Sequence, residues 1–255
     1  MRKSKTVARL LAGEVVQMCA LGHYIPAFVR HAGANGFDCI WLDLEHRLID
    51  DRDVATLLAY SHLCDVDIMI RPPTLEKTRL YRYFEDGAAG VMIPHVSTAE
   101  KAQSIVNAVK FPPIGDRGLD GSGLDSDFYL QGGADYPEQA NRETFVVVQI
   151  ETPQAVANVD EIAAVNGLDG LFVGPGDLGL RLRHSPSEPS LEDCISRVAA
   201  AARQHGKAWG LPVATSEELE KRRAQGAQIL AHGGDFFAII EALKSAAADF
   251  KPTNP

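Results

Sequence analysis

The sequence contains no apolar run of the roughly 20 residues that a membrane-spanning helix requires. The first residues are basic, but Arg9 and Glu14 interrupt the apolar stretch that follows, so we expect no signal peptide. A basic excess is also absent, because the formal net charge is -9, whereas a nucleic-acid interface needs a basic face. We therefore expect a cytoplasmic protein that binds neither membranes nor nucleic acids.

Cysteine is scarce, and several well-known catalytic motifs are missing. The four cysteines, at positions 19, 39, 64 and 194, form no CxxC pair, and most lie in or beside apolar runs. Such cysteines are usually buried, reduced thiols, so we expect no disulfide. The sequence also lacks GxSxG, the P-loop and HExxH, which argues against the enzymes that depend on these motifs.

Eight short apolar segments recur along the 255 residues, and helical periodicity follows most of them. Their Val, Ile, Leu and Phe residues are nearly continuous instead of alternating with polar ones, which is typical of parallel strands buried on both faces. The expected strands are Glu14–Cys19, Asp38–Asp43, Val66–Arg71, Ala88–Pro94, Phe145–Glu151, Asp169–Gly174, Lys207–Leu211 and Gln228–Gly233.

Amphipathic segments between these strands predict helices, several of them with Ser or Thr start signals. The clearest are Asp51–Leu63, Thr98–Val109, Gln154–Val165 and Leu191–His205. Eight strand–helix repeats in this length predict a single α/β domain, a (β/α)₈ TIM barrel over residues 1–255. An open, doubly wound sheet is the alternative. Residues 111–143 break the rhythm, and we expect a long irregular excursion there, with short helices.

Ionisable residues are concentrated where the expected strands end, which in a TIM barrel is the side of the active site. Glu151 and Asp177 follow neighbouring strands, so both carboxylates would point into one mouth of the barrel. Mg²⁺ typically binds one or two carboxylates and keeps several waters. The pair therefore predicts a metal site. The alternative is that each acid pairs with a nearby arginine or caps a helix.

Arg71, His46 and His95 also stand at strand ends. The Arg71 guanidinium suits a carboxylate or an oxyanion, or it is a structural partner for one of the acids. His46 follows Asp43 and Glu45, and a histidine oriented by a carboxylate is a candidate general base. His95 could touch the substrate. No lysine ends an expected strand, which argues against a Schiff-base aldolase.

The stretch from Gly174 to Gly179 matches GxGxxG and follows a strand. A dinucleotide site needs this turn to open directly into a helix, whereas we expect the next helix only near Ser190. We therefore interpret the stretch as a tight turn whose backbone N–H groups can face an anion such as a carboxylate.

At these residues the sequence resembles the HpcH/HpaI aldolase family of metal-dependent class II pyruvate aldolases, such as 4-hydroxy-2-oxoheptanedioate aldolase and 2-dehydro-3-deoxyglucarate aldolase. The likeness covers about residues 8–245. The matching stretches are residues 36–46, Arg71-Pro72, residues 111–118, residues 148–152 and residues 170–178.

The resemblance implies a role for most of the candidate residues. Glu151 and Asp177 would bind a divalent cation, namely Mg²⁺, Mn²⁺ or Co²⁺. Backbone N–H groups of Gly176 and Asp177 would receive the carboxylate of pyruvate. Arg71 would contact the keto oxygen.

Two further roles follow from the same resemblance. His46, with Asp43, would serve the proton transfers through a metal-bound water, and Gln149 would support the waters of the metal site. The family forms hexamers built from trimers, so a trimeric or hexameric homo-oligomer is expected here. An acid of a neighbouring subunit, in this chain Glu85, would lie near the site.

The implied activity is that of a divalent-metal-dependent aldolase, a carbon–carbon lyase. It would cleave or form 4-hydroxy-2-oxo acids through a pyruvate enolate, with pyruvate and an aldehyde as partners. A related carbon–carbon lyase or synthase, or decarboxylation of oxaloacetate, is the alternative among enzymes. A barrel that binds a 2-oxo acid without catalysis is the alternative outside them.

The chain also departs from the family's pattern. Leu44 replaces a usual glycine and is expected to narrow one side of the site, and His95 replaces a usual apolar residue. Residues 120–136 are more acidic than usual, and residues 232–235 are only loosely similar. These departures leave the pyruvate half intact and bear on the acceptor half.

Overall fold

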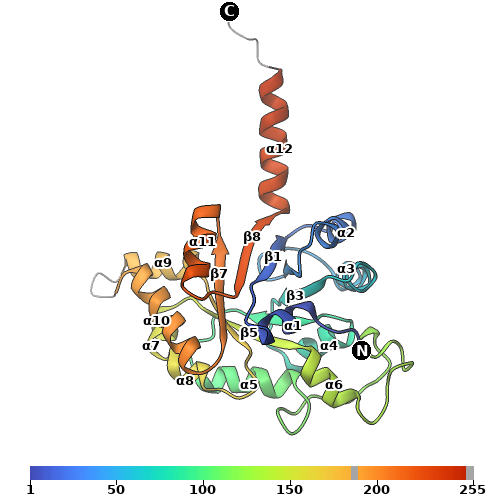
Figure 1. Ribbon diagram of the computed structural model, residues 1–255. Coiled ribbons are helices and arrows are strands. Elements are labelled where there is room, and N and C mark those ends of the chain that lie inside the picture. Colours follow the sequence, from blue (N-terminus) through green and yellow to red (C-terminus); the bar gives the residue numbers. More distant parts are fainter. Residues whose placement is uncertain (185–188, 251–255) are drawn as a thin grey trace, which may run out of the picture.

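The eight expected strands are present and close into one parallel barrel (Figure 1). A computed structural model describes residues 1–184 and 189–250. The strand bounds lie close to the predicted ones, so the TIM-barrel prediction is confirmed and the open sheet is wrong. The strands are β1 (Val16–Leu21), β2 (Cys39–Asp43), β3 (Asp67–Arg71), β4 (Gly90–Ile93), β5 (Phe145–Ile150), β6 (Gly170–Val173), β7 (Ala208–Val213) and β8 (Ile229–Gly234).

Helices follow the strands and surround the barrel (Figure 1). Among the described residues, no helix combines the length and apolarity needed to cross a bilayer. The helices are α1 (Lys5–Leu11), α2 (Pro26–Ala34), α3 (Asp51–Cys64), α4 (Lys77–Glu85), α5 (Ala99–Val109), α6 (Tyr136–Glu143), α7 (Pro153–Ala157), α8 (Val159–Ala163), α9 (Pro175–Arg183), α10 (Leu191–Gln204), α11 (Ser216–Ala224) and α12 (Asp235–Asp249).

Local start signals explain several helix bounds. Thr98, Thr152 and Ser190 each accept a backbone N–H of the first turn that follows, as the sequence predicts. The single helix expected over 154–165 is wrong, because the chain breaks at Asn158 into α7 and α8. The Asn158 side-chain amide donates to the Ser97 carbonyl at 2.8 Å, which ties this break to the loop before α5.

Two layers of apolar side chains stabilise the barrel. The outer layer packs strands against helices, and Cys19 and Cys194 are buried in it, as expected for reduced thiols. The inner layer fills the barrel, so the interior is a packed core and not a pore. Its large members are Met18, Met69, Met92, Phe145 and Phe172.

The excursion at residues 111–143 contains a 3₁₀ turn, η1 (Leu124–Ser126), and the short helix α6. Arg117 is buried inside it and donates to Asp125 at 3.1 Å and to the Tyr136 hydroxyl at 3.2 Å. Its guanidinium also lies 4.5 Å from the centre of the Phe111 ring. Because α6 leads directly into β5, this segment lies at the N-terminal end of the strands.

The last helix, α12, leaves the barrel and projects from it (Figure 1). Asp235 anchors its first turn by accepting the backbone N–H groups of Gly22 and His23, at 3.0 and 2.9 Å. Every residue from Phe237 to Phe250 is exposed, although several are apolar. The helix therefore presents an apolar surface that its own barrel does not cover.

The contact between β7 and β8 leaves no room for a side chain at Gly210. A Cβ atom there would lie 1.7 Å from the backbone oxygen of Ile229, and backbone cannot move aside as a flexible side chain can. We expect Gly210→Ala to lower the free energy of unfolding by about 3 kcal/mol, measured by urea denaturation. Gly133→Ala is the control, because a Cβ at Gly133 meets nothing within 4 Å. Equal stability of the two variants would contradict this packing argument.

Candidate functional site

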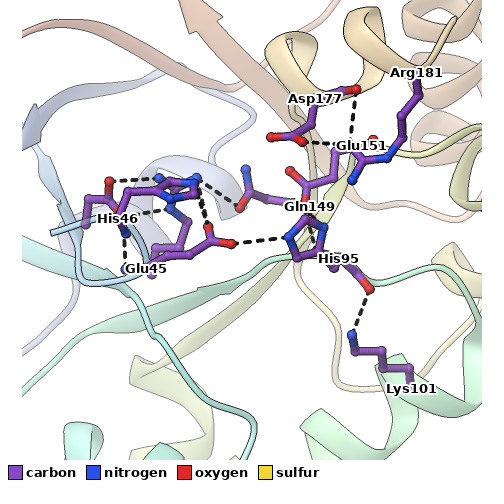
Figure 2. A network of polar contacts seen from close by, with 10 residues as sticks. Glu45, His46, His95, Lys101, Gln149, Glu151, Asp177 and Arg181 are labelled. Carbon is purple, nitrogen blue, oxygen red and sulfur yellow. Dashed lines mark hydrogen bonds and ion pairs between the residues drawn. The ribbon is translucent and has the colours of Figure 1, made fainter. Parts of the chain in front are cut away.

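The strand ends that carry the candidate residues meet at one mouth of the barrel, as Figure 2 shows. The alternation of strand side chains explains their direction. Phe145 and Val147 of β5 belong to the inner core, so Gln149 and Glu151 continue the inward-facing series. The same alternation places Asp43 beyond Trp41 on β2.

Arg71 is the centre of the polar network in this mouth. It is paired in register with Asp43, and its Nε and Nη2 atoms lie 3.0 and 2.8 Å from the two oxygens of that carboxylate. Its Nη1 atom lies 3.2 Å from Glu45 and 3.5 Å from the Gln149 side-chain oxygen. The guanidinium also lies 4.8 Å from the Trp41 ring centre, a cation–π contact. These contacts fix its planar group in one orientation.

Asp43 remains a strong anion in spite of its burial. Burial alone raises its pKa, but the hydrogen bonds and charge of Arg71 outweigh that effect, and the net pKa of Asp43 lies below its usual value. Its Oδ1 atom also accepts the backbone N–H groups of Glu45 and His46, at 3.1 and 3.3 Å. Asp43 therefore holds both Arg71 and the turn that follows β2.

The His46 ring lies beside Glu45, whereas the resemblance pairs His46 with Asp43. Its Nε2 atom is 3.6 Å from the Glu45 carboxylate, whereas Asp43 contacts His46 through the backbone. The His46 side chain is 55% exposed, so solvent and substrate can reach the ring. Glu45 is thus the carboxylate beside the ring, and Asp43 orients the turn that carries it.

Glu151 is a nearly fully buried carboxylate on the opposite side of the mouth. Burial raises its pKa, and the nearby charges of Asp177 and Glu45 raise it further, against the backbone N–H and ring of His95. The His95 N–H donates to Oε1 at 2.6 Å. The other oxygen, Oε2, faces Gly174, where an added Cβ would lie only 2.6 Å away.

Asp177 stands in the first turn of α9, and its placement corrects one expectation. The turn at Gly174 opens directly into this helix at Pro175, so the expectation of a helix only near Ser190 is wrong. Gly174 has no side chain to cap the helix, so no N-cap side chain accepts from the N–H groups of Gly176 and Asp177. The positive end of the helix dipole favours an anion there. The dinucleotide motif itself lies in a closed barrel and not in an open sheet.

The donor set of Glu151 and Asp177 suits a hard divalent cation. The Oδ1 atom of Asp177 accepts a hydrogen bond from Arg181 Nη1 at 2.6 Å. The second carboxylate oxygen, Oδ2, takes no part in this bond. Among the described residues, no group of three His, Cys, Asp or Glu side chains forms a ready-made metal cage. Two carboxylates, of which Asp177 raises the pKa of Glu151, would together with waters match the needs of Mg²⁺ or Mn²⁺. A cation between them would relieve that repulsion.

A cavity of about 640 Å³ opens beside Arg71 and Asp43. Glu151 and Asp177 are not part of its lining, so the mouth has an acidic side at β5 and β6 and a hollow side at β1, β7 and β8. Its walls are mostly apolar, with Arg47 as a cation at the rim. Other lining residues are Trp41, Val213, His232, Phe236 and Ile240.

Two residues singled out by the sequence, Leu44 and Glu85, do not face the mouth or its cavity, and a third, His95, makes contacts that were not predicted. Leu44 is buried in the outer core and does not line the cavity, so its expected narrowing of the site is not direct. Glu85 ends α4, close to the N-terminal end of β4, and therefore lies away from the mouth of its own barrel. His95, expected only as a substrate contact, touches Glu45 and Glu151.

Comparisons with known proteins show what the whole chain is similar to. The model of the HpcH/HpaI aldolase/citrate lyase family matches residues 18–242. The 5-keto-4-deoxy-D-glucarate aldolase of Escherichia coli is 34% identical over 254 residues, which is 97% of each chain. The hydroxypyruvate/pyruvate aldolase of Deinococcus radiodurans is 34% identical over 97% of this chain and 90% of its own. The crystal structure of an HpcH/HpaI aldolase from Desulfitobacterium hafniense has a TM-score of 0.88 and 31% identity, covering 97% of this chain and 98% of that one.

Removal of the Arg71 charge should destabilise the mouth in a pH-dependent way. We expect Arg71→Gln to lower the free energy of unfolding at pH 7 by about 3–5 kcal/mol, because a buried Asp43 carboxylate loses its partner. In the wild type, the contribution of Asp43 is full above the usual pKa of about 3.9 and is lost as the pH falls through the lower folded pKa. In the variant, burial instead raises the pKa of Asp43.

The stability gap between wild type and Arg71→Gln should therefore be largest near neutral pH and shrink as the pH approaches about 4. Urea denaturation at several pH values measures it. Arg79→Gln is the control, because Arg79 and its partner Asp51 are both largely exposed, and such pairs contribute at most about 1 kcal/mol. A gap that is independent of pH would show that Arg71 does not act through Asp43.

Proposed function

This chain belongs to the HpcH/HpaI aldolase/citrate lyase family, and from that premise we propose that it is a divalent-metal-dependent aldolase for 4-hydroxy-2-oxo acids. As a member of this family, the chain is a class II aldolase or lyase that acts on a carbon–carbon bond. The proposed reaction cleaves the acid into pyruvate and an aldehyde, or joins them. The observation that carries the proposal is the buried Glu151 carboxylate beside Asp177, opposite a fixed Arg71.

Glu151 and Asp177 are proposed to hold the cation, which would be Mg²⁺, Mn²⁺ or Co²⁺. When bound, a divalent cation supplies Lewis-acid polarisation of a keto oxygen. Gln149 faces the same space from the end of β5, and its side-chain amide can hydrogen-bond to waters there. The remaining chemistry falls to the side chains and N–H groups of the chain itself.

Arg71 is placed to stabilise negative charge on the former keto oxygen. Its Nε and Nη2 groups are held by Asp43, and its weakest contact is the 3.5 Å approach of Nη1 to Gln149. The Nη1 N–H group on the Gln149 side can therefore donate to a substrate oxygen without a rotation of the guanidinium, while Nη1 keeps its contact with Glu45. Donors fixed in advance stabilise developing charge better than water, which must reorient.

The N-terminus of α9 is proposed to receive the pyruvate carboxylate. The N–H groups of Gly176 and Asp177 point out of the first turn, and a Cβ at Gly176 would meet nothing within 4 Å, so a ligand has free access. A carboxylate held there and a keto oxygen held by Arg71 would fix the orientation of the enolate carbon.

His46 is proposed to move the proton between the substrate hydroxyl and solvent. Its ring is half-exposed beside Glu45, and Asp43 holds the backbone that carries it. A retro-aldol step removes the proton from the 4-hydroxyl while the C3–C4 bond breaks and the electron pair passes into the enolate. The enolate then takes up one proton to give pyruvate.

The cavity on the β1–β8 side supports the acceptor half of the proposal. Its position beside Arg71 and Asp43 leaves space for the aldehyde once the 2-oxo acid occupies the acidic side. Arg47 at its rim favours a partner that carries a carboxylate. This feature supports a second candidate, a related carbon–carbon lyase or synthase that uses a larger carboxylic acid.

The exposed α12 supports the proposal of a homo-oligomer of three or six chains. Phe237 is 74% exposed and Leu243 is 65% exposed, although both stand on a regular helix that leads out of the site. An apolar helix surface that its own barrel does not cover is typical of a protein–protein interface. A second copy of the chain is the partner that we propose.

Turnover tests the reaction. We expect metal-dependent pyruvate release from 4-hydroxy-2-oxo acids, with EDTA abolishing it and Glu151→Gln reducing it at least about 100-fold, because the variant loses a charged ligand. A coupled lactate dehydrogenase assay measures the pyruvate. Glu161→Gln is the matched control, because Glu161 is exposed on α8. Pyruvate release that is indifferent to EDTA and to Glu151 would sink the metal mechanism.

Mass in solution tests the assembly. We expect light scattering to give three or six times 27.6 kDa for the wild type and a smaller mass for Leu243→Glu, because burying that charge in an apolar contact is costly. Leu63→Glu on α3 is the control, because Leu63 is also exposed but lies on a helix that packs on the barrel. A monomeric wild type, or a Leu243→Glu variant with unchanged mass, would contradict the proposal.

A further inference from the structure

His95 follows β4 and stands in a backbone conformation that few side chains adopt. Its φ angle is +56°, in the left-handed region that disfavours residues with a Cβ. Strained backbone at a site mouth calls for an explanation in terms of what the residue holds.

The left-handed turn brings two groups of His95 to the same oxygen of Glu151. Its backbone N–H donates to Oε1 at 2.6 Å, and its ring Nδ1 atom lies 2.9 Å from that oxygen. Lys101 Nζ donates to the His95 carbonyl at 2.8 Å and so holds the turn from its other side. Figure 2 shows the His95 ring between Glu151 and Glu45.

The other edge of the ring faces the opposite half of the mouth. The Nε2 atom of His95 lies 3.3 Å from Glu45 Oε1, and the second oxygen of Glu45 lies 3.2 Å from Arg71. One continuous set of contacts therefore joins Arg71 to Glu151 through Glu45 and His95. The ring spans the two halves of the site that would otherwise be separate.

Glu151 has few other means of orientation. Among the described residues, no arginine or lysine side chain forms an ion pair with its carboxylate within 4.0 Å. Gly174 leaves room beside Oε2 because it has no side chain, since a Cβ there would lie 2.6 Å from that oxygen. Without the His95 ring, only the backbone N–H at this position would hold Oε1, and the carboxylate could rotate away from the orientation seen here.

We infer that His95 is a positioning residue that fixes Glu151 through Oε1, leaves Oε2 for the cation, and links this ligand to the Arg71 network. The inference rests on the proposed function, in which Glu151 is a metal ligand. Groups that orient a metal ligand typically change metal affinity about 10–100-fold when they are removed. The geometry of the proposed cation site therefore depends on His95, which is not itself one of the two proposed ligands, Glu151 and Asp177.

Metal affinity, measured without substrate, tests the inference. We expect His95→Gly to weaken Mn²⁺ binding about 10–100-fold, as measured by electron paramagnetic resonance titration of free Mn²⁺. Glycine relieves the positive φ and keeps the backbone N–H, so loss of affinity would report the ring and not a misfolded turn. Circular dichroism confirms that the variant keeps its fold.

His95→Asn is the rescue variant. Asparagine tolerates the left-handed region, and its side-chain NH₂ can take the place of Nδ1 beside Glu151, although it cannot reach Glu45. We expect its Mn²⁺ affinity to lie within about threefold of the wild type, because the variant restores a side-chain N–H group beside Oε1 of the metal ligand. Equal affinity of wild type and His95→Gly, or failure of His95→Asn to recover the affinity, would overturn the inference.

The Glu151→Gln variant distinguishes a failure of the proposed metal site from a failure of the proposed role of His95. If the wild type binds Mn²⁺ and Glu151→Gln does not, the proposed ligand is established, and the His95 variants alone decide the inference. If Mn²⁺ binds equally well to wild type and Glu151→Gln, the proposed metal site is wrong and the role of His95 falls with it.

Discussion

The site depends on one buried ion pair, that of Arg71 with Asp43. A carboxylate and a guanidinium taken out of water are costly unless each meets a partner in good geometry, and here two nitrogen atoms meet two oxygens across adjacent strands. The β2–β3 register places the pair directly opposite one another. Everything else in the mouth is arranged around this fixed charge, from the Glu45 carboxylate to the Gln149 amide.

The same mouth gives two buried carboxylates opposite characters. Arg71 keeps the pKa of Asp43 low, so that this acid stays ionised and structural. Burial and neighbouring acids raise the pKa of Glu151, whose carboxylate has no arginine ion pair among the described residues and is the proposed cation ligand. The difference is that Asp43 has an arginine directly opposite it on the adjacent strand. This arginine lowers the pKa of Asp43, whereas the pKa of Glu151 is raised.

Sequence patterns could predict the barrel because buried parallel strands leave continuous apolar runs, as in Phe145–Ile150. They could also predict that Asp43, Arg71 and Glu151 share one mouth, because strand ends meet there. They could not predict which acid faces His46, since Glu45 and Asp43 are two residues apart and only the turn decides. The contacts of His95 depend on a left-handed backbone angle that no local signal announces, and the break at Asn158 depends on a tertiary hydrogen bond.

The helix α12 has a consequence for how the enzyme responds to its own concentration. Phe236 and Ile240 of this helix line the cavity, and Asp235 fastens the first turn to the loop after β1. Whatever surface covers the outer part of α12 therefore also sets the position of one wall of the cavity. In the proposed oligomer, subunit association and occupancy of the cavity would therefore be thermodynamically linked, so that a ligand which favours the assembled wall would tighten the assembly, and dilution would weaken the binding of that ligand.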